Sequence, residues 1–228
     1  MPMTVDAVGG VEAAIAAFAA GEPVMVFDSA FRECETDLLW PATAATPEVM
    51  RRLRQDCGGL LFLAIGDEIG QLFDLPWLQD IHTHPALVAD NPVLAHLVTN
   101  DLQYDTRSAF TLSVNHRDTY TGITDRDRSL TTRRFGELAG ELLSSDVNGA
   151  AALEALGAEF RTPGHIPVCR ESPGGLETRQ GHTELAVAIA RLAGQVPATI
   201  GGEMLEPVGD GELSVEDGGE RARTHRRR

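Results

Sequence analysis

A series of short apolar runs, each ended by polar residues, glycine or proline, constrains the fold of this chain most strongly. The runs are four to six residues long and cover Pro23–Phe27, Leu60–Ile65, Ile166–Cys169 and Pro197–Ile200. Runs of this length suit buried strands and are too short for typical helices. The segment Ala109–Val114 instead alternates apolar and small polar side chains, which indicates a half-buried strand.

Helical segments separate these strands. Thr46 and Pro47 are typical of an N-cap followed by a first-turn proline, and Gly21 and Pro23 are typical of a helix end. Between Asp67 and Asp105 three prolines interrupt the pattern, so loops and short helices are expected there. Helices are expected at Val11–Ala20, at Thr46–Asp56, from Thr124 through at least Leu138, and at Glu184–Leu192. This alternation predicts one α/β domain over residues 1–217.

Composition favours a soluble enzyme. The chain of 228 residues is 43% hydrophobic but only 5% aromatic. No apolar run is long enough to cross a membrane, and the first residues lack the pattern of a signal peptide, so a cytoplasmic location is expected. Cys34, Cys57 and Cys169 are too widely spaced for a zinc motif, and no disulfide is expected.

The charged residues of the chain include no lysine, which excludes mechanisms that need a lysine side chain. The net charge is −15, and all 19 basic residues are arginine, because the sequence contains no lysine. Lysine Schiff-base chemistry is therefore excluded, and non-specific binding to nucleic acid is not expected. A lysine-free acidic surface is compatible with a salt-rich environment, although an acidic protein from a GC-rich genome has the same composition.

The end of the chain has a different composition. Residues 218–228 are rich in arginine and lack apolar periodicity, so we expect a basic, disordered tail there.

A first charged loop follows the strand at Pro23–Phe27. It places Arg32 beside the carboxylates Glu33, Glu35 and Asp37. Hard divalent cations bind carboxylate oxygens and usually take one or two of them from the protein. Taken alone the loop is a weak signal, since charge runs are more often solvated.

A second loop leads directly into the helix at Glu184–Leu192. Its sequence is Arg179-Gln180-Gly181-His182-Thr183. The start of a helix and an arginine together can bind a phosphate, with Arg179 as a bidentate partner, and His182 can provide an imidazole ligand. An ordinary histidine in the first helical turn is an equally good interpretation of His182 alone.

Two further residues have ionisable side chains suited to proton transfer. His165 lies in what we predict to be a tight turn at Pro163-Gly164-His165, and Glu203 follows an apolar strand where burial can raise its pKa. By contrast, His82 and His84 could bind a metal on a strand, but surface placement is the preferred interpretation.

The ordered series of motifs resembles 3,4-dihydroxy-2-butanone-4-phosphate synthase, an enzyme of riboflavin biosynthesis. The resemblance extends from Val11 to Glu206, and the order is more specific than any one motif. The motifs are Arg32–Leu38, Phe110–Val114, Thr121–Thr124 with Asp127-Arg128, Pro163–His165 and Thr178–Glu184.

The resemblance implies a mixed sheet flanked by helices, and conversion of D-ribulose 5-phosphate to L-3,4-dihydroxy-2-butanone 4-phosphate and formate with Mg²⁺ or Mn²⁺. It implies a homodimer with active sites at the subunit interface. By motif, Glu33 and His182 correspond to metal ligands, and His165 and Glu203 to essential catalytic positions. The implied substrate-binding residues are Arg32, Glu33, Asp37, Arg179, Gln180, Gly181, His182, Thr183 and Glu203.

The sequence also departs from the family pattern. Cys34 and Thr36 replace the usual Asn and Gly of the first motif, and the closing helix and strand of the family are not recognisable after Leu213. Two alternatives therefore stay open from the sequence: a catalytically idle relative with a binding or regulatory role, and another metal-dependent sugar-phosphate lyase or isomerase.

Overall fold

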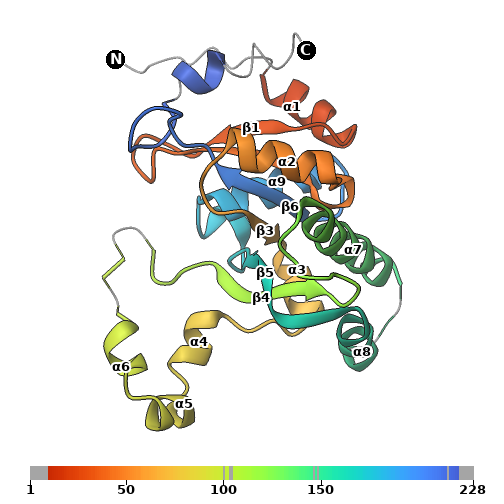
Figure 1. Cartoon of the computed structure of the whole chain (residues 1–228), viewed down its shortest axis with the longest axis vertical. Helices are drawn as coiled ribbons and strands as arrows, with labels where there is room; N and C mark the ends of the chain where they lie inside the picture. The colour runs from red at the N-terminus through yellow and green to blue at the C-terminus, as the bar shows by residue number, and fades with distance from the viewer. Residues whose placement is uncertain are drawn as a thin grey trace.

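A computed structural model of the chain describes residues 10–99, 101–102, 105–145, 147, 149–214 and 216–220. Its centre is a six-stranded sheet in the order β1-β2-β6-β3-β5-β4 (Figure 1). Only β3 and β5 pair in parallel among these neighbours, and the other pairs are antiparallel. The fold is therefore a mixed α/β fold, as predicted. The strands are β1 (Val24–Phe27), β2 (Thr36–Pro41), β3 (Phe62–Ile65), β4 (Phe110–His116), β5 (Phe160–Arg170) and β6 (Ala198–Glu203).

Helices cover the sheet and enclose two clusters of buried side chains. The larger cluster joins α2 and α7 to the sheet through residues such as Met50 and Phe135, and the smaller one joins α1 and α9 to it through Phe18 and Val187. The helices are α1 (Gly10–Ala19), α2 (Pro47–Asp56), α3 (Asp67–Leu72), α7 (Asp125–Leu143), α8 (Gly149–Glu159) and α9 (His182–Leu192), with 3-10 turns η1 (Ala42–Ala44) and η2 (Gly175–Glu177). No described helix combines the length and apolarity needed to span a membrane.

The predicted helix starts are confirmed by their caps. The hydroxyl of Thr46 accepts a hydrogen bond from the backbone N–H of Val49, and Pro47 occupies the first turn of α2. Thr124 caps α7 in the same way, accepting from the N–H of Asp127. The cap residues therefore fix where these two helices begin.

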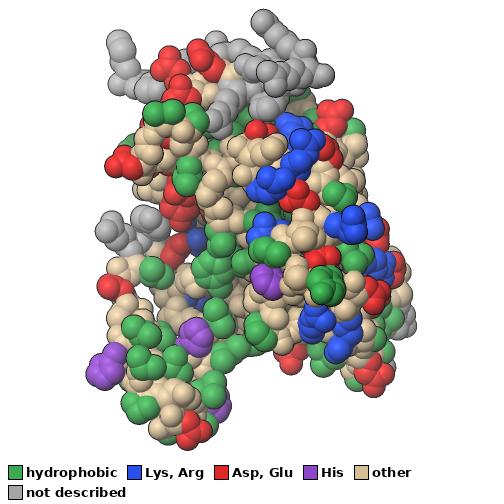
Figure 2. All heavy atoms as spheres, viewed as in Figure 1, with side chains coloured by type: hydrophobic (Ala, Val, Ile, Leu, Met, Phe, Trp, Pro, Cys, Tyr) green, Lys and Arg blue, Asp and Glu red, His purple; other side chains and the backbone are tan. Residues whose placement is uncertain are grey.

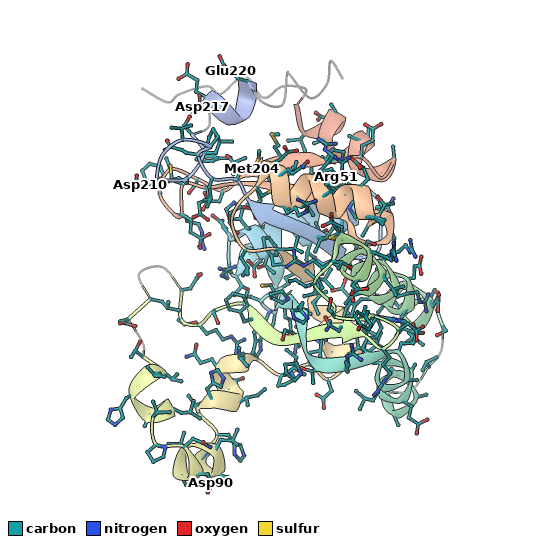
Figure 3. The ribbon with its side chains drawn as sticks, viewed as in Figure 1. Arg51, Asp90, Met204, Asp210, Asp217 and Glu220 are labelled. Carbon is teal, nitrogen blue, oxygen red and sulfur yellow. The ribbon has the colours of Figure 1, made fainter. Side chains whose placement is uncertain are left out.

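An arm made of α4 (Leu78–His82), α5 (Pro85–Asp90) and α6 (Leu94–Leu97) projects from the body, with Asp90 at its far end (Figures 1 and 3). None of the residues in these three helices is fully buried. Figure 2 shows hydrophobic and histidine side chains together on its surface. The loops and short helices predicted for this stretch are confirmed, and His82 ends a helix instead of lying on a strand.

One local expectation was wrong, and another is tested only at its first residues. Pro163, Gly164 and His165 lie inside β5, not in a tight turn, and the β4–β5 pairing is irregular beside them. In the predicted basic tail, residues 218–220 are helical, while residues 221–228 lie outside the described residues.

Candidate metal and phosphate site

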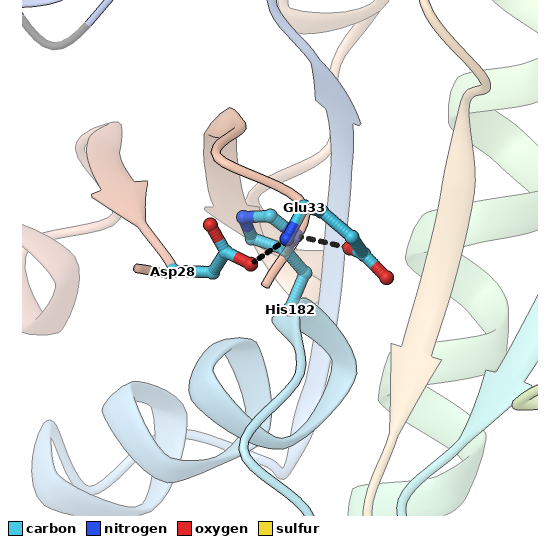
Figure 4. Close-up of side chains that lie close together, drawn as sticks. All are labelled: Asp28, Glu33 and His182. Carbon is cyan, nitrogen blue, oxygen red and sulfur yellow. Dashed lines mark hydrogen bonds and ion pairs between the residues drawn. The ribbon is translucent and has the colours of Figure 1, made fainter. Parts of the chain in front are cut away.

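The two polar loops meet at the side chain of His182, as Figure 4 shows. His182 is the first residue of α9. Its Nδ1 lies 3.2 Å from Oε2 of Glu33, and its Nε2 lies 3.2 Å from the carbonyl oxygen of Glu35. The fold thus brings together two segments that the sequence separates by 149 residues.

The first loop is held in place by Asp28. The paired part of the β1–β2 hairpin ends at Phe27 and Thr36, so the residues between these two form the loop that joins the strands. The carboxylate of Asp28 accepts hydrogen bonds from the backbone N–H groups of Glu33, at 3.0 Å, and Glu35, at 3.2 Å. These bonds orient Glu33 towards His182.

Asp28, Glu33 and His182 form a donor set that fits a divalent cation. One ligand atom from each lies within 4.8 Å of the others. Carboxylate oxygens suit Mg²⁺ and Mn²⁺, and an imidazole is a usual ligand of transition metals. Sequence reasoning named Glu33 and His182 as ligand candidates but missed Asp28, although Asp28 directly follows the strand β1.

Protonation of His182 is coupled to Glu33. Burial alone would lower the pKa of His182, but the hydrogen bond to Glu33 and the nearby carboxylates raise this pKa to about 9. The same hydrogen bond lowers the pKa of Glu33. Without a metal the two groups form an ion pair, and a metal that binds His182 must displace a proton.

Asp37 is a buried acid of strand β2, whereas the sequence placed it in the loop. Its side chain is fully buried, and burial, reinforced by neighbouring carboxylates, raises its pKa to about 8. Neither carboxylate oxygen accepts a hydrogen bond from the described residues, although Oδ1 lies 3.6 Å from Nε2 of His182. Asp37 can therefore carry a proton at neutral pH.

Two more carboxyl groups lie beside this acid. Glu203 ends β6 directly opposite Asp37 in the sheet, and burial raises its pKa, as expected from the sequence. The pKa of Glu35 is also raised, first by burial and then by the charge of Glu203. Acids with raised pKa values can donate and accept protons near neutral pH.

Arg179 is held by two carboxylates. Its Nε and one terminal nitrogen donate to Oδ2 of Asp105 at 2.9 and 2.7 Å, and its other terminal nitrogen donates to Glu184 at 2.5 Å. Arg32 also lies 3.4 Å from Oδ2 of Asp105. Two donor nitrogens of Arg179, which we predicted to be a bidentate phosphate partner, are thus occupied by Asp105. Sequence reasoning missed Asp105 because it lies in the proline-interrupted stretch.

The remaining residues of the second loop start α9. Gly181 is the N-cap residue, and a Cβ there would lie 2.2 Å from a terminal nitrogen of Arg179, so glycine allows Arg179 to fold back over the helix start. Thr183 is buried, and Gln180 is exposed. A cavity of about 300 Å³ opens beside them and is lined by polar groups from both loops, including Glu33, Asp105, Arg179, His182, Thr183 and Glu203.

Comparison with known proteins identifies the family. The family profile for 3,4-dihydroxy-2-butanone 4-phosphate synthase matches residues 12–227. The chain belongs to this family. The protein of that name from Methanosarcina mazei is 41% identical over 214 residues, which are 93% of this chain and 83% of the relative. That from Methanothermobacter thermautotrophicus is 38% identical over 215 residues, or 94% of this chain and 89% of the relative.

Solved structures of the synthase family share the fold. The crystal structure of a 3,4-dihydroxy-2-butanone 4-phosphate synthase in complex with two magnesium ions superimposes with a TM-score of 0.69 at 27% identity. It covers 95% of this chain, which in turn covers 89% of the solved chain. The family resemblance and the fold class expected from the sequence are both confirmed.

His165 lies apart from the cluster of Asp28, Glu33 and His182 in this synthase-family chain. It is exposed on β5 and lines a second cavity, of about 310 Å³, together with Arg128, Cys57 and Gly202. The lining of the cavity that holds Glu33 and His182 does not include His165 among the described residues. A single chain therefore does not bring all of the expected site residues together.

Proposed function

We propose that this chain converts D-ribulose 5-phosphate to L-3,4-dihydroxy-2-butanone 4-phosphate and formate, a step of riboflavin biosynthesis. Family membership gives the reaction, and the contact between Glu33 and His182 carries the proposal for this chain. That contact places the proposed metal-binding atoms in a cavity that is also lined by Arg179 and by Glu203, an acid with a raised pKa.

Glu33 and His182 are the proposed metal ligands, with Asp28 as a third candidate. A solved relative whose description names two magnesium ions supports a divalent cation, and Mn²⁺ accepts the same carboxylate oxygens. When bound, the cation would polarise the carbonyl and hydroxyl oxygens of the sugar.

The protein groups would hold the substrate and move its protons. Asp37 and Glu203, with raised pKa values, are the proposed acid and base groups on one side of the sugar. The phosphate would bind at the start of α9, beside Thr183. Arg179 and Arg32 would provide positive charge there, while Gln180 and Gly181 shape the turn.

We also propose a homodimer in which His165 reaches the site of the second copy. The support is its exposed position away from the metal cluster. Two large apolar side chains on loops are almost wholly exposed, Phe31 at 96% and Tyr120 at 94%, and a second copy would bury them. Sedimentation of the purified chain measures the oligomeric state directly, and a monomer at assay concentration would contradict this proposal.

The activity test uses purified protein with Mg²⁺ or Mn²⁺ and ribulose 5-phosphate, scored for formate and for the four-carbon product. Assays at low and high KCl also test the proposed adaptation to salt, which predicts best activity and solubility at high KCl. Absence of formate under every condition would refute the synthase proposal.

Variants test the metal ligands. Glu33→Ala and His182→Ala are expected to abolish turnover and to weaken Mn²⁺ binding measured by titration calorimetry. Exposed residues provide matched controls, and Glu177→Ala and His84→Ala should leave both measurements unchanged. If the first two variants keep normal turnover, the ligand assignment is wrong.

A further inference from the structure

Asn115 contacts His165 at two points. It lies on β4, is only 4% exposed, and faces the irregular part of β5. Its Oδ1 accepts a hydrogen bond of 2.8 Å from the backbone N–H of His165. Its Nδ2 lies 3.0 Å from Nδ1 of the His165 ring.

The first contact determines the orientation of the amide group. A backbone N–H can only donate, so the amide atom at 2.8 Å must be the oxygen. The other amide atom is then the nitrogen, which also can only donate. The ring Nδ1 must accept from it and carries no hydrogen. In neutral His165 the single ring hydrogen is therefore on Nε2.

We infer that Asn115 is a positioning residue that keeps neutral His165 in the tautomer with its hydrogen on Nε2. The ring thereby offers a hydrogen-bond donor, not a lone pair, to whatever oxygen it meets. This inference rests on the proposed function for its consequence in catalysis, since His165 acts there on the sugar phosphate.

Neighbouring glycines leave the space that this arrangement needs. Gly122 has φ of +89°, and a Cβ at this position would lie 2.2 Å from Nδ2 of Asn115. The carboxylate of Asp127 fixes the Gly122 loop, accepting from the N–H of Thr121 at 3.1 Å and of Gly122 at 2.8 Å. The loop therefore packs against Asn115 and limits its rotation.

Gly164 has a similar role on the other strand. A Cβ on Gly164 would lie 1.9 Å from the backbone carbon of Val114, the residue before Asn115. The N–H of Gly164 donates to the hydroxyl of Ser113 at 3.1 Å. The two backbones thus approach closely enough for the side chain of Asn115 to reach both the N–H and the ring of His165.

The tautomer decides which step His165 can assist. A neutral imidazole that donates from Nε2 can polarise a carbonyl oxygen or stabilise the negative oxygen of an enediolate. A general base would need a bare Nε2 to take the proton from carbon. We therefore assign His165 to the sugar oxygens, and the carbon-bound protons to Asp37 and Glu203, the proposed acid and base groups.

Nitrogen NMR of ¹⁵N-histidine-labelled protein tests the inference without turnover. The His165 signals are identified by their loss in His165→Gln. In the wild-type protein Nδ1 should have the shift of an unprotonated nitrogen, and Nε2 that of a protonated one. A protonated Nδ1 in neutral His165 would overturn the inference, and this reading needs no variant at Asn115.

The variant Asn115→Asp provides a second test. A carboxylate accepts at both oxygens, so it should draw the hydrogen to Nδ1 and exchange the two nitrogen signals. Asn91→Asp is the matched control, because it adds the same charge on the exposed arm and should leave the His165 signals unchanged. Unchanged signals in a folded Asn115→Asp protein would contradict the role of Asn115.

Kinetics separates positioning from a purely structural role. Asn115→Asp is expected to lower kcat about tenfold or more with KM within about twofold, because the donor is lost while the binding groups remain. If Asn115→Asp exchanges the tautomer of His165 but has the same kcat as Asn91→Asp, the Nε2–H of His165 is not used as a donor in the reaction. Absence of formate from the wild-type protein would refute the proposed function but not the inferred tautomer, since the NMR measurement does not depend on turnover.

Discussion

Replacement of Asp37 by asparagine is expected to stabilise the metal-free protein at neutral pH while abolishing turnover. Asparagine has nearly the same shape as aspartate but cannot ionise. Asp37 is fully buried, and neither of its oxygens accepts a hydrogen bond from the described residues. Its negative charge is therefore costly to the folded state, and the amide removes this cost.

The magnitude follows from the pKa of Asp37, which rises from 3.8 to about 8 on folding. Since the folded state holds this proton more tightly, the unfolded state ionises first as the pH rises. The contribution of Asp37 to stability is thus lost progressively between about pH 4 and pH 8. Each pKa unit corresponds to about 1.4 kcal/mol, so the loss is roughly 4 kcal/mol at pH 7.

Urea unfolding of the wild-type protein and the Asp37→Asn variant in EDTA, at pH 4, 6 and 8, measures the effect. The two free energies of unfolding should be similar at pH 4, and the variant should become increasingly more stable than the wild type as the pH rises. The exposed Asp90→Asn is the control, and it should show no such divergence. A difference between Asp37→Asn and the wild type that is the same at pH 4 and pH 8 would refute the reasoning.

Three further predictions follow from backbone geometry and from the metal ligands. Cys34 has φ of +60°, which asparagine tolerates better, so Cys34→Asn should raise the free energy of unfolding by about 0.5–1 kcal/mol in urea titrations. Gly164→Ala should lower it by about 3 kcal/mol, because its Cβ would overlap the backbone of Val114; Gly157→Ala, on a helix with open space, should not. Mn²⁺ affinity measured by calorimetry should rise steeply between pH 6 and pH 9, because the pKa of His182 is about 9 and the metal displaces its proton; a flat profile would exclude His182 as a ligand.

Local patterns predicted the secondary structure well where neighbouring residues determine the start of a helix. Thr46 with Pro47, and Thr124, start helices because their side chains and backbone satisfy the first N–H groups, which depends only on neighbouring residues. The helix Gly149–Glu159 was not predicted, because its alanine-rich sequence has two glycines and little amphipathic pattern.

The site was only partly predictable because its decisive contacts are not local. The resemblance named Glu33 and His182 as candidate ligands, and the structure brings them into contact. Asp105 was missed because its partners Arg32 and Arg179 lie 73 and 74 positions away in the sequence. Asp37 was assigned to the loop because it follows a run of charges, whereas pairing of β2 with β6 buries it. A short stretch of sequence around Asp37 or Asp105 does not contain the distant residues that determine its burial or its hydrogen bonds.

The contact between Glu33 and His182 also has a consequence for the order in which the protein becomes functional during synthesis. The first loop leaves the ribosome well before α9 and β6, which provide His182 and Glu203. Contacts of such long sequence separation form late, since the intervening chain must first be ordered. A nascent chain can thus contain a complete β1–β2 hairpin and still lack the proposed metal site until α9 brings His182 to Glu33.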